Sequence, residues 1–319
     1  MMMKQQYAIF TGSCFAFPTI QRLQQLDMLA CVVLVNSPAN PDLTQLQALL
    51  AQHQIKTLQY SLQSEIQLLA ELDALQVSAG LVYWFRHKIS PQVIQFFNGW
   101  LFNIHPGKLP DYRGPMPLYW QLRHGEKQLC LTLHRVAAEF DSGDIGMEQL
   151  VPIHPFDSLQ CLYQKAAQYA PQLIERLLNA IQSDDICWQA QAQKDVTGAP
   201  KISEQDLIVD WHRHSSEDIV NMARAGNSDC GGVILPFPQG NFHLYQASKV
   251  NCELSGITVG TVLEVSIQAG MLIKTKDSAL RLDIISCPQG FFDGYRFALL
   301  FGLDAGTCID MALHRKNNV

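Results

Sequence analysis

The sequence lacks the features that define several large classes of protein. No apolar run approaches the ~20 residues that a membrane-spanning helix needs, which argues against a transmembrane protein. The nine cysteines stand singly, with no Cys-x-x-Cys and no cysteine–histidine pair at zinc spacing, so we expect reduced thiols and no metal. The first residues lack the long apolar region and cleavage site of a secretory signal. These absences favour a cytoplasmic protein with no membrane partner.

Basic charge and a dinucleotide-binding motif are also scarce. The formal net charge is -6 at pH 7, and residues 205–319 contain nine Lys or Arg against twelve Asp or Glu. Tight binding to nucleic acid needs Lys and Arg contacts to phosphates, so this balance disfavours it. The first apolar strand runs into Thr11-Gly12-Ser13, with one glycine where Gly-x-Gly-x-x-Gly would be needed. The main support for a nucleotide-dependent dehydrogenase is therefore missing.

The chain does contain a regular alternation of strand and helix patterns. Its 319 residues, 48% of them hydrophobic, are enough for a large core and for two domains. The alternation predicts an α/β fold with a Rossmann-like, mostly parallel, doubly wound sheet. The predicted strands cover 7–13, 29–35, 55–58, 79–85, 99–105, 129–136 and 144–153, and the predicted helices cover 17–23, 43–53, 64–75, 91–97, 117–123 and 157–181.

The pattern changes after residue 182. Residues 183–204, with Asp-Asp, repeated Gln-Ala, a glycine and a proline, are typical of a linker. A helix at 215–224 and short strands at 242–247, 260–265, 271–275 and 280–285 then predict a small β-barrel. We therefore predict an α/β domain over 1–182, a linker over 183–204 and a smaller β domain over 205–319.

The most informative stretch begins at Asn103-Ile104-His105, directly after the apolar run 99–102. On a strand, residues two apart point to the same face, so Asn103 and His105 should emerge together where the strand ends. The Pro-Gly that follows stops the strand, and ligands of α/β sheets bind beyond such strand ends. An isolated histidine there is more often a hydrogen-bonded structural residue than a catalyst. A second motif favours a catalytic role for this histidine.

An acidic turn, Phe140-Asp141-Ser142-Gly143-Asp144, follows another apolar strand in the same part of the chain. Together, the pattern Asn-x-His-Pro-x-x-Leu-Pro-x-x-Arg-Gly and this Asp-Ser-Gly-Asp turn resemble the formyltransferases that use 10-formyltetrahydrofolate. The resemblance is to methionyl-tRNA formyltransferases and their relatives that act on amino sugars. It is strong over 103–144, and after 205 it implies an OB-like carboxy-terminal domain.

The resemblance implies catalytic roles for Asn103, His105 and Asp141. An amine attacks the formyl carbon, so a donor must stabilise the developing oxyanion and a base must take a proton from nitrogen. Asn103 suits the first task, His105 suits the second or can help to hold the oxyanion, and Asp141 would orient the imidazole or hold a water. His134, on the strand before the acidic turn, is interpreted as an ordinary strand residue.

The resemblance also implies where the folate binds. The segment after the fourth predicted strand lines the folate pocket in the family, which makes Phe85, Arg86 and Ile89 candidate folate contacts. Asp141 and Asp144 of the acidic turn are candidates as well. The charges of 86–88 fit a solvated surface loop equally well.

The acceptor is predicted from charge. Relatives that act on tRNA carry a basic insertion after the second strand, whereas residues 31–60 contain only Lys56 and no Arg. We therefore favour a small amine, such as an amino sugar nucleotide, whose phosphates Lys108 and Arg113 could contact, although Arg113 could instead brace the turn. Methionyl-tRNA is the alternative acceptor. A 10-formyltetrahydrofolate hydrolase and a non-catalytic folate-binding protein also stay open, as does the oligomeric state.

Overall fold

The computed structural model describes residues 5–35, 40–192, 198–252 and 255–310. The chain divides into two compact units. The amino-terminal unit consists of Met1–Pro117, Gln128–Ile153 and Leu162–Pro200, and the carboxy-terminal unit of Leu118–Lys127, His154–Cys161 and Lys201–Val319. The predicted linker at 183–204 thus lies mostly within the amino-terminal unit, and its residues 193–197 fall outside the described residues.

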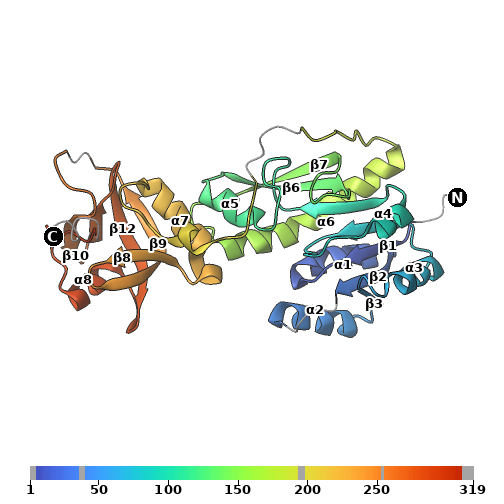
Figure 1. The fold of residues 1–319 in the computed structure, drawn as a ribbon, viewed down its shortest axis with the longest axis horizontal. Coiled ribbons are helices and arrows are strands. Elements are labelled where there is room, and N and C mark those ends of the chain that lie inside the picture. Colours follow the sequence, from blue (N-terminus) through green and yellow to red (C-terminus); the bar gives the residue numbers. More distant parts are fainter. Residues whose placement is uncertain (1–4, 36–39, 193–197, 253–254, 311–319) are drawn as a thin grey trace. The chain divides into compact units, whose positions relative to one another are not determined.

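A seven-stranded sheet forms the centre of the amino-terminal unit, with strand order β3-β2-β1-β4-β5-β6-β7 (Figure 1). Strands β1 to β5 run parallel, whereas β6 and β7 are antiparallel. The expected mostly parallel α/β sheet is confirmed, with an antiparallel pair at one edge. The strands are β1 Tyr7–Phe10, β2 Leu29–Val35, β3 Thr57–Tyr60, β4 Ala79–Val82, β5 Leu101–His105, β6 Gln128–Arg135 and β7 Ile145–Pro152.

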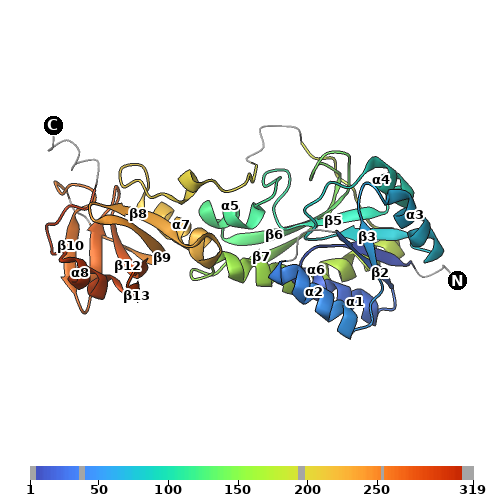
Figure 2. The same cartoon turned by 60° about the horizontal axis from the view of Figure 1, so that its bottom comes forward.

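Helices cover both faces of this sheet, as Figure 2 shows for α1 and α2 on one side and α4 on the other. Side chains of α3 and α4 pack with alternate residues of the strands, such as Ala8 and Phe10 of β1. On the opposite face, Arg22 of α1 forms an ion pair with Glu175 of α6, with Nε 2.5 Å from Oε1. The helices of this unit are α1 Phe17–Gln25, α2 Pro41–Gln52, α3 Glu65–Ala74, α4 Pro91–Phe97 and most of α6 Leu159–Ser183, whereas α5 Pro117–Arg123 belongs, after its first residue, to the carboxy-terminal unit.

Local sequence explains where these elements begin. Ser90 accepts a hydrogen bond from the backbone N–H of Val93 at 3.2 Å, and Pro91 occupies the first helical position of α4. The cap therefore fixes the end of the loop 83–90, which leaves β4 at the carboxyl edge of the sheet. The same edge carries the end of β5, so both segments meet where a ligand of an α/β protein is expected.

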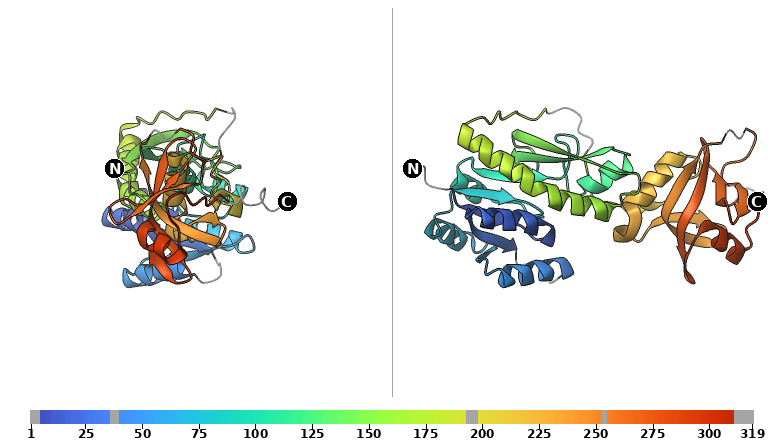
Figure 3. Two further views of the ribbon diagram at one scale, coloured as in Figure 1. Left: turned by 90° about the vertical axis from the view of Figure 1, so that its left-hand side faces the viewer. Right: turned by 180° about the vertical axis from the view of Figure 1, so that it is seen from behind.

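The carboxy-terminal unit is built on an antiparallel sheet with order β10-β11-β12-β9-β8, in which β13 pairs with β12. Its core packs around Trp211, Phe237, Phe242 and Phe297. The expected small β domain is confirmed, but the sequence prediction missed β8, β13 and α8, which are labelled in Figure 2. In Figure 3 these elements lie in the part of the ribbon in orange and red. The elements are α7 Ser216–Cys230, β8 Val233–Phe237, β9 Gly240–Val250, β10 Val262–Ser266, β11 Gly270–Lys274, β12 Ala279–Cys287, β13 Gly290–Phe292 and α8 Gly294–Phe301.

Across the described ranges, every helix is too short or too polar to cross a bilayer.

Candidate active site

The end of β5 presents Asn103 and His105 on the same face of the sheet. They lie two and four residues after Leu101, which has the same orientation and packs against α3 and α4. β5 is flanked by β4 and β6, and Asn103 is paired with His134 across the antiparallel ladder. Because β5 lies between two strands, His105 is only 4% exposed. The site is therefore built on a rigid, internal strand.

Asp141 comes to the same place from the turn between β6 and β7. Its backbone has φ +53, in the left-handed region that few residues other than glycine adopt. The turn also requires Gly143, because a Cβ there would lie 1.9 Å from the carbonyl oxygen of Arg135. The N–H of Gly114 donates to Asp141 Oδ2 at 3.1 Å, which leaves Oδ1 to face β5.

The three residues that the resemblance implied are in direct contact. Asn103 Nδ2 donates to Asp141 Oδ1 at 3.3 Å, and His105 Nδ1 lies 3.4 Å from the same oxygen. The side chains of His105 and Asp141 are 5% and 12% exposed, so little water screens this pair. One carboxylate oxygen thus meets both an amide and an imidazole.

The other nitrogen of His105 is held by the turn that follows the strand. His105 Nε2 lies 2.7 Å from the carbonyl oxygen of Tyr112, which can only accept, so Nε2 carries a hydrogen. The turn approaches so closely that a Cβ on Gly107 would lie 2.8 Å from Nε2. Glycine is therefore required there, and Nδ1 is the only nitrogen of His105 that can take part in chemistry.

His134 belongs to this cluster, which corrects the interpretation of an ordinary strand residue. Its Nδ1 donates to the carbonyl oxygen of Arg135 at 2.8 Å, so Nε2 has the lone pair that accepts from Asn103 Nδ2 at 2.9 Å. Burial lowers the pKa of His134 to about 4, although the Asp141 carboxylate opposes this shift. His134 is therefore neutral at physiological pH, and it orients the amide of Asn103.

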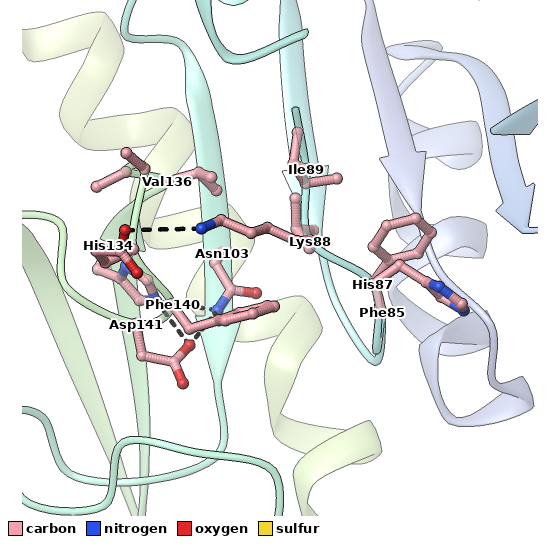
Figure 4. A pocket seen from close by; sticks show the side chains of 13 residues that line it. Phe85, His87, Lys88, Ile89, Asn103, His134, Val136, Phe140 and Asp141 are labelled. Atoms are coloured by element: carbon pink, nitrogen blue, oxygen red, sulfur yellow. Dashed lines mark hydrogen bonds and ion pairs between the residues drawn. The ribbon is translucent and has the colours of Figure 1, made fainter. Parts of the chain in front are cut away.

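A cavity of about 70 Å³ lies beside these side chains (Figure 4). Phe85 and Ile89, two of the predicted folate contacts, line it together with Asn103 and Asp141. Lys88 reaches across the pocket in Figure 4, and its Nζ lies 3.6 Å from Glu139 Oε1. The lining residues are Val82, Phe85, His87, Lys88, Ile89, Asn103, His134, Val136, Ala137, Ala138, Glu139, Phe140 and Asp141.

Two predicted folate contacts lie outside this lining. Arg86 is exposed, unlike its neighbours Phe85 and Ile89. Asp144 follows the glycine of the acidic turn, and its carbonyl oxygen accepts a hydrogen bond from the N–H of Arg135 at 2.9 Å. The structure therefore does not bring Arg86 or Asp144 into the cavity.

The two predicted phosphate contacts have different surroundings. Lys108 is exposed on the turn after β5. Arg113 is partly buried, and its Nε and Nη2 donate to Gln191 Oε1 at 3.0 and 2.6 Å. Arg113 thus braces the turn, which was the second of its two predicted roles. Among the described residues, no group of three or more His, Cys, Asp and Glu side chains could hold a metal ion.

The chain matches a known family over most of its length. Residues 8–178 match the formyl transferase family, and residues 201–290 match the carboxy-terminal domain of formyl transferases. The first match alone covers more than half of the sequence. The chain therefore belongs to the formyl transferase family.

Solved structures with the same fold include enzymes described as sugar formyltransferases. WlaRD, a sugar 3-N-formyltransferase with dTDP and 5-N-formyl-THF, is 18% identical, with a TM-score of 0.63 over 87% of this chain and 96% of that chain. The N-formyltransferase from Helicobacter canadensis, with folinic acid and dTDP-3-aminofucose, is 16% identical, with a TM-score of 0.64 over 86% and 98%. HypX from Aquifex aeolicus, with tetrahydrofolic acid, is 17% identical, with a TM-score of 0.55 over 92% and 47%.

Proposed function

We propose that this protein transfers the formyl group of 10-formyltetrahydrofolate to a primary amine of a small molecule. The observation that carries the proposal is the contact of Asn103, His105 and Asp141 beside a pocket with both apolar and polar lining residues, in a member of the formyl transferase family. An amide donor, an imidazole and a carboxylate are the groups that this transfer needs. The pterin end of the folate would lie against Phe85 and Ile89.

In the proposed reaction, the amine nitrogen attacks the formyl carbon, and the carbonyl oxygen becomes an oxyanion. Asn103 has two amide hydrogens: one is held by His134 at 2.9 Å, and the other makes the longer bond to Asp141 at 3.3 Å. The longer bond is the weaker one, so this hydrogen is the one that the oxyanion can accept while the other stays on His134. Such a donor is worth roughly 3 kcal/mol in other acyl-transfer sites.

Proton transfer falls to His105 and Asp141. Because Tyr112 holds Nε2, the proton leaving the amine must be taken at His105 Nδ1 or at the neighbouring Asp141 Oδ1. The bond between the formyl carbon and N10 of the folate then breaks, and N10 takes up a proton. The products are the N-formylated amine and tetrahydrofolate, so the proton balance closes.

For the acceptor, we propose an amino sugar nucleotide. The net charge of -6 and the single Lys56 in residues 31–60 favour a compact acceptor over tRNA. Two of the similar structures are described as acting on sugars or hold an aminosugar nucleotide, which supports the same choice. Lys108, exposed beside the site, is the candidate contact for a phosphate.

The test is a folate-product assay with 10-formyltetrahydrofolate and a panel of amines, aminosugar nucleotides and methionylated initiator tRNA. We expect amine-dependent release of tetrahydrofolate, fastest with an aminosugar nucleotide. His105→Ala and Asp141→Ala should each lower kcat by about 100-fold, as for other general acid-base groups. Calorimetry should still detect folate binding in both variants, with a weaker affinity in Asp141→Ala because Asp141 lines the pocket.

Other outcomes would contradict the proposal in different ways. Release of formate without any amine would indicate a hydrolase. Binding of folate without turnover of any compound in the panel would indicate a non-catalytic folate-binding protein. Near-wild-type kcat in either alanine variant would remove that residue from the mechanism.

A further inference from the structure

The segment predicted as a linker contributes a side chain that touches two parts of the site. Gln191 Nε2 donates to the carbonyl oxygens of Asp141 at 2.8 Å and Gly143 at 2.6 Å. Its Oε1 accepts two hydrogen bonds from the guanidinium of Arg113. A single amide therefore joins the turn after β5 to the turn after β6, and all of its hydrogen-bonding groups are used in doing so.

The chain around Gln191 is anchored on the sheet. Gln189 pairs with Ile145 at the start of β7 through two backbone hydrogen bonds, of 2.8 and 2.9 Å. Trp188 stacks on Phe102 of β5, with ring centroids 5.6 Å apart and 5° between the planes. Arg135 lies 4.3 Å from the centroid of the same indole. Residues 188 and 189 thus present Gln191 to the site from a fixed position.

Asp141 needs such a support because of how the chain reaches it. Residue 136 hydrogen-bonds to Leu101, and residues 136–141 then line the pocket back towards Asn103 without pairing in the sheet. At the end of this path, Asp141 has the strained backbone described above. Left-handed backbone at a non-glycine residue persists only where the surroundings hold it. The two hydrogen bonds from Gln191 hold the backbone carbonyl oxygen of Asp141 itself and that of Gly143, two residues later in the chain.

We propose that Gln191 is a positioning residue for formyl transfer: it fixes the turn at Asp141, so that the carboxylate stays beside His105 and Asn103. The inference rests on the proposed function for its kinetic consequence, but the geometric consequence stands on its own. We call the hydrogen bonds of the Gln191 side chain to Arg113, Asp141 and Gly143 the clamp. Without the clamp, Asp141 Oδ2 should also lose its hydrogen bond from the N–H of Gly114, which belongs to the same turn as Arg113. The Gly114 amide therefore reports on the clamp directly.

The experiment compares three variants with the wild-type protein. Gln191→Met keeps the length of the side chain and removes all its hydrogen bonds. Gln191→Glu keeps the acceptor for Arg113 but loses both N–H donors to the turn at Asp141. Gln189→Ala is the matched control, because the Gln189 side chain is exposed two residues away. Each is measured for kcat, for KM of both substrates, for 5-formyltetrahydrofolate binding by calorimetry, and for the Gly114 amide signal by NMR.

We expect kcat to fall about 100-fold in both Gln191 variants, which is the cost of a misplacement of about 1 Å. KM and folate binding should change much less than kcat, because Gln191 itself does not line the pocket and Asp141 is the one lining residue that it holds. The Gly114 amide proton should shift in both Gln191 variants, and Gln189→Ala should match the wild type in every measurement.

Several results would overturn the proposal. An unchanged Gly114 signal in Gln191→Met would show that the turn holds itself, whatever reaction the protein catalyses. Full kcat in Gln191→Glu would show that only the contact to Arg113 matters. Failure of both variants to fold would make Gln191 a purely structural residue. If the wild-type protein transfers no formyl group but the Gly114 signal shifts as expected, the proposed function fails and the clamp stands.

Discussion

Two buried histidines face the Asp141 carboxylate from neighbouring strands, and their hydrogen bonds give them different tasks. Nε2 of His105 donates to Tyr112, and its Nδ1 lies 3.4 Å from Asp141. Nδ1 of His134 donates to Arg135, and its Nε2 accepts from Asn103. His134 Nε2 is also 3.8 Å from Asp141, but a neutral imidazole makes no ion pair there. In the proposed reaction, His105 is the histidine that takes part in proton transfer, and His134 holds the Asn103 amide.

Because His134 is neutral in the folded protein, we expect the free energy of unfolding to depend on pH. Its pKa is lowered to about 4 by burial, whereas an unfolded histidine has a pKa near ~6.5. Below pH ~6.5, His134 therefore binds a proton in the unfolded chain but not in the folded protein. The free energy of unfolding thus falls as the pH falls towards 4. Between pH 7 and 5, His134 should account for a loss of roughly 2 kcal/mol, measured by urea unfolding.

His134→Gln is the comparison, because a glutamine amide can still accept from Asn103 but does not titrate. Asp141 and His105 face position 134 and are present in both proteins, so the difference between the two pH profiles isolates His134. Equal slopes between pH 7 and 5 would mean that His134 is charged in the folded protein.

Sequence patterns predicted some of these residues and missed others for a physical reason. Asn103 and His105 belong to one contiguous motif that ends a strand, so their shared face follows from strand geometry. His134 was missed because the alternation of Leu131 and Leu133 in β6 was interpreted as one buried face. β6 lies inside the sheet and is buried on both faces, with His134 2% exposed.

The turn between β6 and β7 is the element on which the site depends most. A side chain at Gly143 would collide with the carbonyl oxygen of Arg135, and backbone atoms cannot give way as a flexible side chain can. Gly143→Ala should therefore open the turn, displace Asp141 and lower kcat by about 100-fold, as expected for a misplaced catalytic group. The same variant should lose roughly 1–3 kcal/mol of stability through overpacking.

Steady-state kinetics and urea unfolding check this prediction. Ser142→Ala is the matched control, because it removes only the surface bond from the Ser142 hydroxyl to the carbonyl oxygen of Glu139. It should change stability by no more than ~0.5 kcal/mol. A Gly143→Ala protein with wild-type kcat would show that Asp141 does not depend on the shape of this turn.

At the level of elements, the α/β alternation was predictable and the supporting segment was not. Residues 183–204 have no hydrophobic period and contain repeated Gln-Ala, which is typical of a linker. Among the described residues of this segment, Gln189 forms a β-bridge with Ile145, and the Trp188 ring and the Gln191 amide fix the position of the segment. Contacts of single side chains between distant segments leave no periodic pattern in a sequence.

On the scale of the whole molecule, charge distinguishes the possible acceptors. The chain carries 23 Lys and Arg against 29 Asp and Glu. Beside the site, Arg113 is committed to Gln191, and Lys88 forms an ion pair with Glu139. Lys108, on the turn after β5, forms no ion pair with any of the described residues, and it is suited to one phosphate group. This charge pattern fits a nucleotide sugar better than a polyanion.

The same charge pattern predicts weak binding of tRNA. If the protein bound initiator tRNA through six phosphate contacts, its affinity for the tRNA would fall by about 10³ as the salt concentration rose from 50 to 200 mM, because each contact releases counterions. We expect this protein to bind methionylated initiator tRNA weakly, with a much smaller dependence on salt, and to formylate it more slowly than an aminosugar nucleotide. Filter binding over that salt range, with competing rates measured in the same buffer, checks both points. Lys108→Ala should raise KM for the nucleotide sugar and leave KM for the folate unchanged. Tight binding of the tRNA with a steep salt dependence, and faster formylation of it, would reverse the assignment of the acceptor.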